Sequence, residues 1–306
     1  MHVGLLYSRI RRDEKLLLSE LRERGHDVTK IDVRREQFNI SAAPAVFDEI
    51  DVVLDRCLAT SRSLYITRFL DAYGVEVVNS SETAQLCADK VKNSLALEAA
   101  GVPTPDTTVA FTTDAALEAI EAFGYPCVLK PVVGSWGRLM AKIDTRDAAE
   151  AILEHKATLG HYEHKVFYVQ EFVEKPGRDI RVLAVDGDPV AAMTRSSEHW
   201  LTNAAKGGET AAFELDDRAL ELVEKASAAV GGGLLGVDLM EVGSVSESGD
   251  SEARGTPSHA DYTVHEVNHT VEFKALNDAV GESVDVPGRV VDWLEAKAKT
   301  ETEATA

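Results

Sequence analysis

Short apolar segments alternate with amphipathic segments along the first 80 residues, and this alternation restricts the fold more than any other feature. Residues 2–7 form an apolar run suited to a buried strand, and the amphipathic stretch 14–24 that follows ends at Gly25, a helix stop signal. The pattern is repeated by strand-like runs at 28–33 and 51–55 and by a helical stretch at 64–73. Strands that alternate with helices predict a parallel sheet covered by helices.

The rest of the chain is predicted as two mixed units and a tail. Helical signals cover 82–100, 114–123, 146–155, 217–230 and 287–297, and strand signals cover 127–131, 142–144, 167–172 and much of the chain after 179. The stretch 243–261 is rich in Ser, Gly, Asp and Glu and is predicted to be a solvated insertion. We therefore predict an α/β protein with an N-terminal parallel domain (1–86), a central α+β unit (87–173), a C-terminal α+β unit (174–295) and a disordered tail (296–306).

Charge and cysteine usage exclude several classes of function. The chain has 52 acidic against 32 basic residues, a formal charge of -20, so nucleic acid is not expected as a partner. Such a surface fits a salt-adapted protein or simply an acidic soluble one. The three cysteines are isolated, which favours reduced thiols in a cytoplasm. The sequence contains no run of about 18 apolar residues, so no membrane span is predicted.

A lysine followed by a glycine-bracketed loop is the sharpest local motif. Lys130 ends a predicted strand, and the loop that follows contains Gly134, Ser135, Trp136, Gly137 and Arg138. Glycines let backbone amides approach phosphate oxygens closely, and a lysine adds a point charge. The loop lacks the Gly-Lys-Ser/Thr triplet of a P-loop, and a plain hairpin with a surface lysine explains it equally well. An upstream lysine, Lys90, is by itself read as a solvated helix residue.

Oxygen-bearing side chains on two predicted strands point to a metal site. Asp238 lies in an otherwise apolar strand, and Glu266 and Asn268 share one face of a later strand because strand side chains alternate. Mg²⁺ prefers oxygen ligands and bridges nucleotide phosphates, whereas structural ion pairs are the alternative. Two further stretches offer a nucleotide contact: backbone groups of Glu171 and Val173 could meet an adenine edge and Asp179 a ribose, although ordinary strands explain them too.

These motifs stand in the chain order that resembles the ATP-grasp superfamily. The resemblance covers about residues 1–290 and is closest to the RimK-like branch, within it to LysX/ArgX-type ligases that act on the amino-group carrier protein LysW. The narrower match is carried by residues 134–138, 200–208 and 266–274. The resemblance implies an ATP-grasp fold, with an N-terminal domain followed by two subdomains that clamp ATP.

The resemblance also implies roles at the matched positions. Lys90 and Lys130 would contact the phosphates while the loop 134–138 closes over them, and Mg²⁺ would be held by Asp238, Glu266 and Asn268. The nucleotide would further contact Glu171, Phe172, Val173, Asp179 and Asn203. The amino-acid substrate would face Arg195, Thr202, Asn203, Glu272, Phe273 and Lys274. Lys130 and Arg195 would be the catalytic residues.

The implied activity is ADP-forming ligation of an amino acid to a protein, within arginine or lysine biosynthesis. The α-amine of glutamate or 2-aminoadipate would be joined, through an acyl-phosphate, to the C-terminal glutamate of an acidic LysW-like carrier. Family resemblance further implies a cytoplasmic homo-oligomer, a dimer or tetramer. Arginines at 9, 11, 12, 34 and 35 offer a basic patch for the carrier, although such arginines are commonly just solvated.

Two departures and two alternatives remain. The insertion at 243–261 lengthens the spacing between Asp238 and Glu266. The pair Ala275-Leu276 matches neither the glutamate nor the aminoadipate pattern, and an apolar Leu276 would shorten a pocket, which favours glutamate. A RimK-like ligase that adds glutamate to another protein and a non-catalytic ATP-binding module are the alternative functions.

Overall fold

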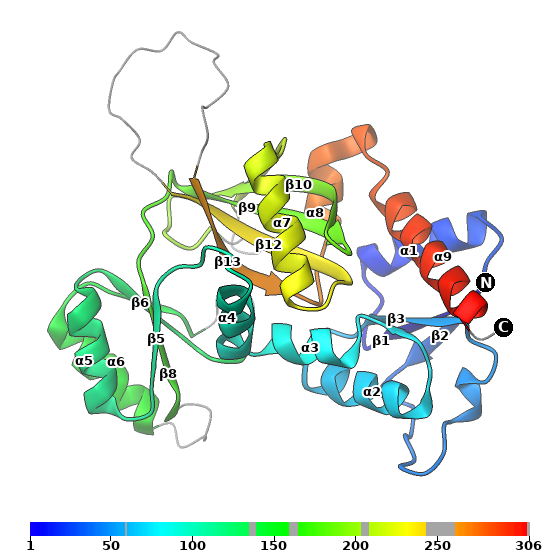
Figure 1. Cartoon of the computed structure of the whole chain (residues 1–306), viewed down its shortest axis with the longest axis horizontal. Coiled ribbons are helices and arrows are strands. Elements are labelled where there is room, and N and C mark those ends of the chain that lie inside the picture. The colour runs from blue at the N-terminus through cyan, green and yellow to red at the C-terminus, as the bar shows by residue number, and fades with distance from the viewer. Residues whose placement is uncertain (59, 135–138, 159–164, 203–207, 243–260, 305–306) are drawn as a thin grey trace, which may run out of the picture.

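The computed structural model describes residues 1–58, 60–134, 139–158, 165–202, 208–242 and 261–304. These residues form three sheets, each in one of the three units expected from the sequence (Figure 1). Of the insertion predicted at 243–261, residues 243–260 lie outside the described residues and Asp261 begins a strand. The α/β fold class is confirmed.

The N-terminal sheet is parallel, as predicted. Its strands are β1 (His2–Tyr7), β2 (Asp27–Asp32), β3 (Val52–Arg56) and β4 (Val77–Val78), in the order β2-β1-β3-β4. The connecting helices are α1 (Arg12–Glu23), the short η1 (Ala45–Phe47) and α2 (Thr60–Tyr73). A parallel sheet is normally buried on both faces. Here Leu6 and Val53 face α2 on one side, whereas Val3 and Leu5 face α1 on the other.

The last helix of the chain completes the cover of this first sheet. Helix α9 (Val286–Ala304) packs along α1, and its Val290 and Leu294 share a core with Leu5 and Leu17 (Figure 1). The division into consecutive units did not predict this return. The helix also continues to Ala304, which corrects the predicted start of a disordered tail at 296. Residues 289–304 contain neither glycine nor proline, so nothing in the sequence ends the helix earlier.

The central unit is a four-stranded antiparallel sheet covered on one face by two helices. Its elements are α3 (Ser81–Ala88), α4 (Lys90–Ala99), β5 (Thr107–Ala110), α5 (Thr113–Phe123), β6 (Cys127–Lys130), β7 (Ala141–Ile143), α6 (Arg146–Thr158) and β8 (Phe167–Glu171). The strand order is β5-β8-β6-β7. The helix predicted over 82–100 is broken at Asp89, whose side chain caps α4 by accepting from the amides of Val91 and Lys92. Lys90 therefore begins a helix.

The C-terminal unit is a five-stranded antiparallel sheet in the order β11-β10-β9-β12-β13. Its elements are β9 (Arg178–Val185), β10 (Asp188–Ser196), β11 (Glu209–Ala212), α7 (Asp217–Ala229), β12 (Leu234–Val242), β13 (Asp261–Asn268), α8 (Lys274–Val280) and the short η4 (Gly281–Ser283). Helix α7 packs on one face through Leu222 and Val223. The opposite face is polar near Asp238, and this face forms part of the pocket described below.

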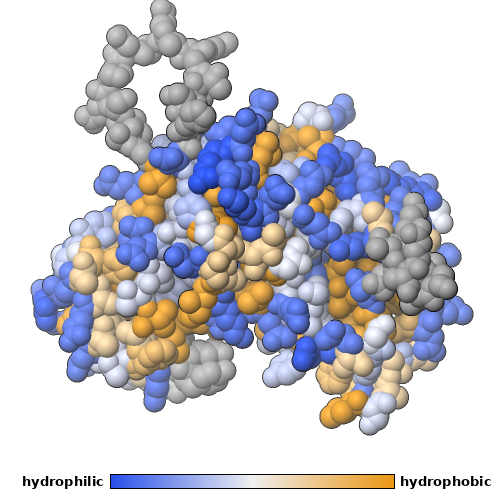
Figure 2. Space-filling view, viewed as in Figure 1, coloured by the Kyte–Doolittle hydropathy of each residue, from blue (hydrophilic) through white to orange (hydrophobic). Residues whose placement is uncertain are grey.

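Hydrophilic residues cover much of the face seen in Figure 2, in keeping with the excess of acidic residues. Among the described helices, none combines the length and hydropathy of a membrane span.

Candidate functional site

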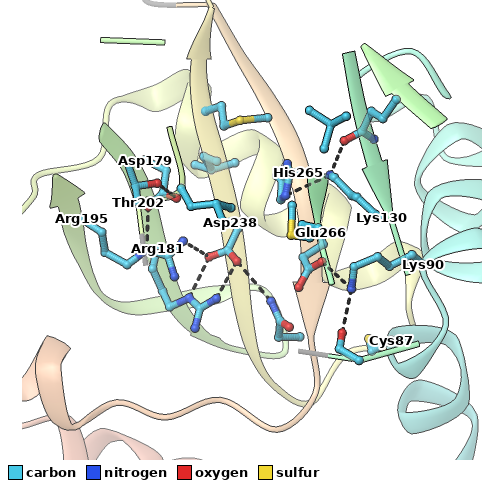
Figure 3. Close-up of a pocket in the computed structure, with 18 of the residues that line it drawn as sticks. Cys87, Lys90, Lys130, Asp179, Arg181, Arg195, Thr202, Asp238, His265 and Glu266 are labelled. Carbon is cyan, nitrogen blue, oxygen red and sulfur yellow. Dashed lines mark hydrogen bonds and ion pairs between the residues drawn. The ribbon is translucent and has the colours of Figure 1, made fainter. Parts of the chain in front are cut away.

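A large pocket lies where the central and C-terminal sheets meet, with a volume of about 410 Å³. Its walls come from α4, β6 and β8 on one side and from β9, β10, β12 and β13 on the other (Figure 3). The segment 268–275 closes a further side. Most of the residues singled out from the sequence line this one cavity.

The two lysines predicted to contact phosphate, Lys90 and Lys130, both line the pocket. Lys90 Nζ is 3.1 Å from Glu266 Oε2 and donates to the carbonyl of Gly134 at 3.0 Å. Its backbone amide donates to the carbonyl of Val132 at 2.9 Å. The start of α4 therefore holds the base of the glycine loop, where Gly134 has a φ of 122° that a side chain would strain. The predicted loop residues Ser135, Trp136, Gly137 and Arg138 lie outside the described residues.

Lys130 is buried at the end of β6, with 2% of its surface exposed. Its ammonium donates to the side-chain oxygen of Gln170 and lies 3.1 Å from Nε2 of His265 (Figure 3). Burial lowers the pKa of Lys130 to about 7, although the nearby Glu266 opposes the shift. Burial, followed by the charge of Lys130, also lowers the pKa of His265 to about 3, so this imidazole is neutral. A buried cation with so few counter-charges is suited to an incoming anion.

The predicted metal ligands meet on two neighbouring strands. Asp238 on β12 is directly opposite Glu266 on β13, and Asn268 Nδ2 is 3.3 Å from Asp238 Oδ2. The register of the two strands shifts between Asp238 and Leu239, so that β13 carries an extra residue at 265. Bulges of this kind re-aim side chains beside active sites. As a result both His265 and Glu266 line the pocket, which simple alternation did not predict.

Arginines neutralise the buried Asp238. Arg181 binds it with two hydrogen bonds of 2.7 and 2.6 Å, and Arg195 Nη2 donates to it at 3.0 Å (Figure 3). Burial raises the pKa of Asp238, but Arg181 and Arg195 outweigh burial and hold the pKa well below its usual range. Burial likewise opposes ionisation of Glu266, and Lys90 outweighs it, so the pKa of Glu266 is lowered. Both carboxylates are therefore ionised at neutral pH.

This donor set fits a hard divalent cation. Two ionised carboxylates and an amide supply oxygens, the ligand type that Mg²⁺ prefers. Among the described residues no three His, Cys, Asp or Glu side chains gather as a metal site, so an all-protein cage is not present there. A cation here would take few protein ligands, which is the way Mg²⁺ binds together with nucleotide phosphates.

The predicted adenosine segment follows β8 along the pocket edge. Glu171, Phe172 and Val173 all line the pocket. The Glu171 carboxylate accepts from the amide of Asp106 at 2.8 Å, and the Glu171 amide donates to the carbonyl of Asp106 at 2.9 Å, so both groups already have partners. The Phe172 ring lies under the Lys142 ammonium at 4.7 Å.

Asp179, predicted to contact ribose, contacts two of the predicted substrate residues. It accepts from Arg195 Nε at 2.6 Å and from the hydroxyl of Thr202. Lys175 donates to the same hydroxyl at 2.7 Å and lies 3.6 Å from Asp179. Arg195 and Asp179 are opposite each other on β10 and β9, so the strand register brings them together. Asn203 lies outside the described residues.

Some residues of the segment 272–276 line the pocket, and others are buried in the core. Glu272, Lys274 and Ala275 line the pocket. Phe273 is 0% exposed and packs in the core, which corrects its expected place beside the substrate. Leu276, on the buried side of α8, is 1% exposed and belongs to the same core. The inference that Leu276 shortens the pocket is therefore wrong, because an α-helix turns adjacent residues to different directions.

The pocket residues to which the sequence analysis gave no role include Gln170, Lys175, Arg181 and His265. Arg181 stands two residues after Asp179 on a strand, so alternation could have placed it on the same face. The arginines suggested as a carrier patch are mostly ion-paired: Arg11 with Glu14 and Glu272, Arg12 with Asp278, and Arg34 and Arg35 with Asp32.

Two protein-family models match this chain, one over the N-terminal domain and one over the region that follows it. Residues 3–86 match the model of the LysX preATP-grasp domain, and residues 87–246 match that of the RimK-like ATP-grasp domain. The chain belongs to the RimK-like ATP-grasp family. Members of this family are ATP-dependent ligases that use a divalent metal, which accounts for the lysines and carboxylates that face one another in the pocket.

Relatives of this ATP-grasp ligase extend over nearly its whole length. It is 31% identical to "Glutamate--LysW ligase ArgX" of Sulfolobus acidocaldarius, over 96% of this chain and 98% of that protein. It is 32% identical to "Alpha-aminoadipate--LysW ligase LysX" of Sulfurisphaera tokodaii, over 90% of this chain and 92% of that one. The crystal structure of a RimK domain ATP-grasp protein from Sphaerobacter thermophilus superposes with a TM-score of 0.76 at 29% identity, covering 96% of this chain and 99% of that chain.

Proposed function

We propose that this ATP-grasp ligase joins the α-amine of glutamate or 2-aminoadipate to the C-terminal glutamate of an acidic LysW-like carrier protein, through an acyl-phosphate, in the cytoplasm. The observation that carries the proposal is the pocket itself. Asp238, Glu266 and Asn268 face Lys90 and Lys130 across one cavity, the arrangement that phosphoryl transfer needs. The names of the two relatives supply the acceptor and the amino acid.

On this proposal the first step transfers the terminal phosphoryl group of ATP to a carboxylate of the carrier's C-terminal glutamate. Lys90 and Lys130 stabilise the charge on the transferred group, which is chiefly an electrostatic and positioning task. Asp238, Glu266 and Asn268 would hold Mg²⁺, which supplies further neutralisation of phosphate charge. Because Lys130 has a pKa of about 7 in the protein alone, phosphate oxygens beside it favour its protonated form.

In the second step the amine of glutamate attacks the acyl-phosphate carbon and phosphate leaves, forming an amide bond. The amino acid and the carrier tail both bring carboxylates that need cations. Arg195 and Lys175 are oriented by Asp179 and lie on the pocket wall, and a guanidinium has more N–H donors than its contacts to Asp179 and Asp238 use. We assign Arg195 and Lys175 to carboxylate binding on this basis.

The test is ADP release measured with ATP, Mg²⁺, carrier and amino acid, each omitted in turn. Release that requires the carrier and glutamate, with gain of one glutamyl residue on the carrier by mass spectrometry, is the expected result. A carrier shortened by its terminal glutamate is the matched control and should give no product. Release that ignores the carrier would contradict the proposal.

Two other functions are outcomes of the same assay. The relative named for 2-aminoadipate is as similar as the one named for glutamate, so 2-aminoadipate is tested in parallel. Glutamate added to an unrelated protein tail would indicate a general protein ligase. Nucleotide binding without acceptor-dependent ADP release would indicate a non-catalytic module. The oligomeric state remains a prediction, and size-exclusion chromatography with light scattering tests it.

A further inference from the structure

Side chains of the N-terminal domain reach the segment 269–274, which forms one wall of the pocket. His269, Thr270, Glu272 and Lys274 all line the pocket, yet the segment itself belongs to no strand and begins a helix only at Lys274. A loop of this kind has no strand ladder to fix it. Its position therefore depends on contacts from elsewhere in the molecule.

The first contact comes from Asn79, just after β4. Its side-chain amide donates to the carbonyl of His269 at 2.7 Å and to the carbonyl of Leu234 at 2.8 Å. Its side-chain oxygen accepts from the amide of Leu234 at 2.6 Å. Asn79 thus attaches the end of the first sheet to the beginning of β12 and to the start of the pocket segment.

The second contact comes from Arg56, the last residue of β3. Its side chain is 1% exposed, and Nη1 donates to the carbonyl of Val271 at 2.9 Å. The guanidinium carbon lies 5.6 Å from the centre of the Phe273 ring. Arg56 therefore holds the residues on both sides of Glu272.

The third contact comes from Arg11, the N-cap of α1. Its Nη1 lies 2.5 Å from Glu272 Oε1. Glu14, whose side chain is 0% exposed, links the two arginines: it accepts from Arg11 Nε at 3.0 Å and Nη2 at 2.6 Å, and from Arg56 Nε at 3.2 Å. One buried carboxylate thus orients both cations that reach the pocket segment.

The buried cluster formed by Arg11, Glu14 and Arg56 is expected to add little to the stability of the fold. Removing charges from water costs free energy, and apolar side chains of similar volume often stabilise a core as well or better. Arg56 Nη2 is buried without a hydrogen bond among the described residues and is 3.9 Å from Asp13. A cluster with this cost gives directional contacts, which an apolar core lacks.

We propose that Arg56, with Arg11 and Glu14, is a positioning residue that holds the segment 271–274 where the amino-acid substrate binds. This inference rests on the proposed function, because it takes Glu272 and Lys274 as part of the acceptor side of the pocket. Within the described part of the chain, the hydrogen bonds, ion pairs and ring contact of Arg56 go to Asp13, Glu14, Val271 and Phe273, and none of these residues belongs to α4 or β6, the elements that carry Lys90 and Lys130. Loss of the Arg56 side chain should therefore weaken amino-acid binding and leave nucleotide binding unchanged.

The test compares Arg56→Met, Arg56→Lys and Arg11→Gln in steady-state kinetics. We expect the KM for the amino acid to rise about tenfold in Arg56→Met while the KM for ATP changes less than about twofold. Arg56→Lys keeps the charge but not the fork that bridges Glu14 and Val271, so it should not restore the KM. Arg11→Gln lies at the edge of the cluster and should give a smaller rise. Equal changes in both KM values, or none, would overturn the proposal.

Arg24→Gln is the matched control. Arg24 also lies at the end of α1 and also bridges to a distant element, through Asp292 of α9 at 2.5 Å, but it contacts nothing near the pocket segment. It should lower the melting temperature and leave both KM values unchanged. A rise in the amino-acid KM in this variant would show that general destabilisation, not positioning, is measured.

Hydrogen exchange followed by mass spectrometry gives an answer that does not depend on activity. In Arg56→Met, amides of 269–276 should exchange faster while those of β8 stay unchanged. If the wild type releases no ADP with any carrier and amino acid, the proposed function fails, and this exchange pattern alone decides whether Arg56 positions the segment. Uniform exchange across both regions would refute positioning even in an active enzyme.

Discussion

The pocket wall formed by β12 and β13 and the wall formed by residues 269–276 are built by different means. On the strands, Asp238 and Glu266 are set opposite each other by backbone pairing, within the C-terminal sheet itself. In the second wall, Glu272 is set by side chains of the N-terminal domain, more than two hundred residues away in the sequence. Alternation along strands predicts the first wall, whereas Glu272 and Lys274 of the second wall were expected only from the family resemblance.

The largest effect is expected from Asp238→Asn, which removes a carboxylate from the wall formed by β12 and β13. Arg181 loses its buried counter-charge, Arg195 keeps only its contact to Asp179, and the metal loses a carboxylate, so turnover should fall on the order of 10³-fold. Leaving the buried Arg181 without its carboxylate should also cost about 3–5 kcal/mol of folding free energy. ADP release and urea unfolding measure the two losses. Turnover close to that of the wild type would contradict the assigned role of Asp238.

A smaller loss is expected from Asn93→Ala, because Asn93 acts on the first wall indirectly. Its amide donates to the carbonyl of Val267 at 3.0 Å and its oxygen accepts from the same residue's amide at 3.1 Å. Val267 lies between Glu266 and Asn268, so a shift there displaces both and should lower kcat about 10- to 100-fold. The loss should be larger than for Asn79→Ala, whose contacts lie at the end of the strand. Equal kcat values in the two variants would weaken the distinction between the walls.

The pH dependence of nucleotide affinity probes Lys130. Its pKa in the free protein is about 7, lower than normal, so the ammonium loses its proton as pH rises through 7. Phosphate binding favours the protonated form, so affinity for ADP should fall by up to about tenfold per pH unit above pH 7. Calorimetric titration between about pH 7.5 and 9 avoids the ionisation of the phosphates, whose second pKa is near 6. Lys130→Arg, which stays charged, should remove this dependence, and a flat wild-type profile would contradict the assignment.

The smallest functional effect is expected at Leu276. Leu276→Val should cost about 1 kcal/mol of stability, because the side chain is buried in the core. The ratio of kcat/KM for glutamate and 2-aminoadipate should stay within about twofold. Ala275→Val, at the adjacent pocket position, should change that ratio more. A change in selectivity at Leu276 and none at Ala275 would reverse our placement of the pocket boundary.

The sequence allowed much of the fold and of the first wall to be predicted. Periodicity indicated the parallel first sheet, and alternation along β13 put Glu266 and Asn268 on one face. The extra residue at 265 was not predictable, because a bulge depends on pairing with β12 and not on β13 alone. The burial of Phe273 and Leu276 depends on a core shared with distant α1 and α9, which no local pattern encodes.

The return of α9 to the first sheet has a consequence for how the chain may be cut. Because Val290 and Leu294 of α9 fill the same core as Leu5 and Leu17, a fragment that stops at the end of α8 would leave that face of the sheet open to solvent. The first and last elements lie together, so a circular permutant that joins the two ends and opens a surface loop elsewhere retains every one of these contacts. The N-terminal sheet therefore needs α9 to complete its core, although the two are far apart in the sequence.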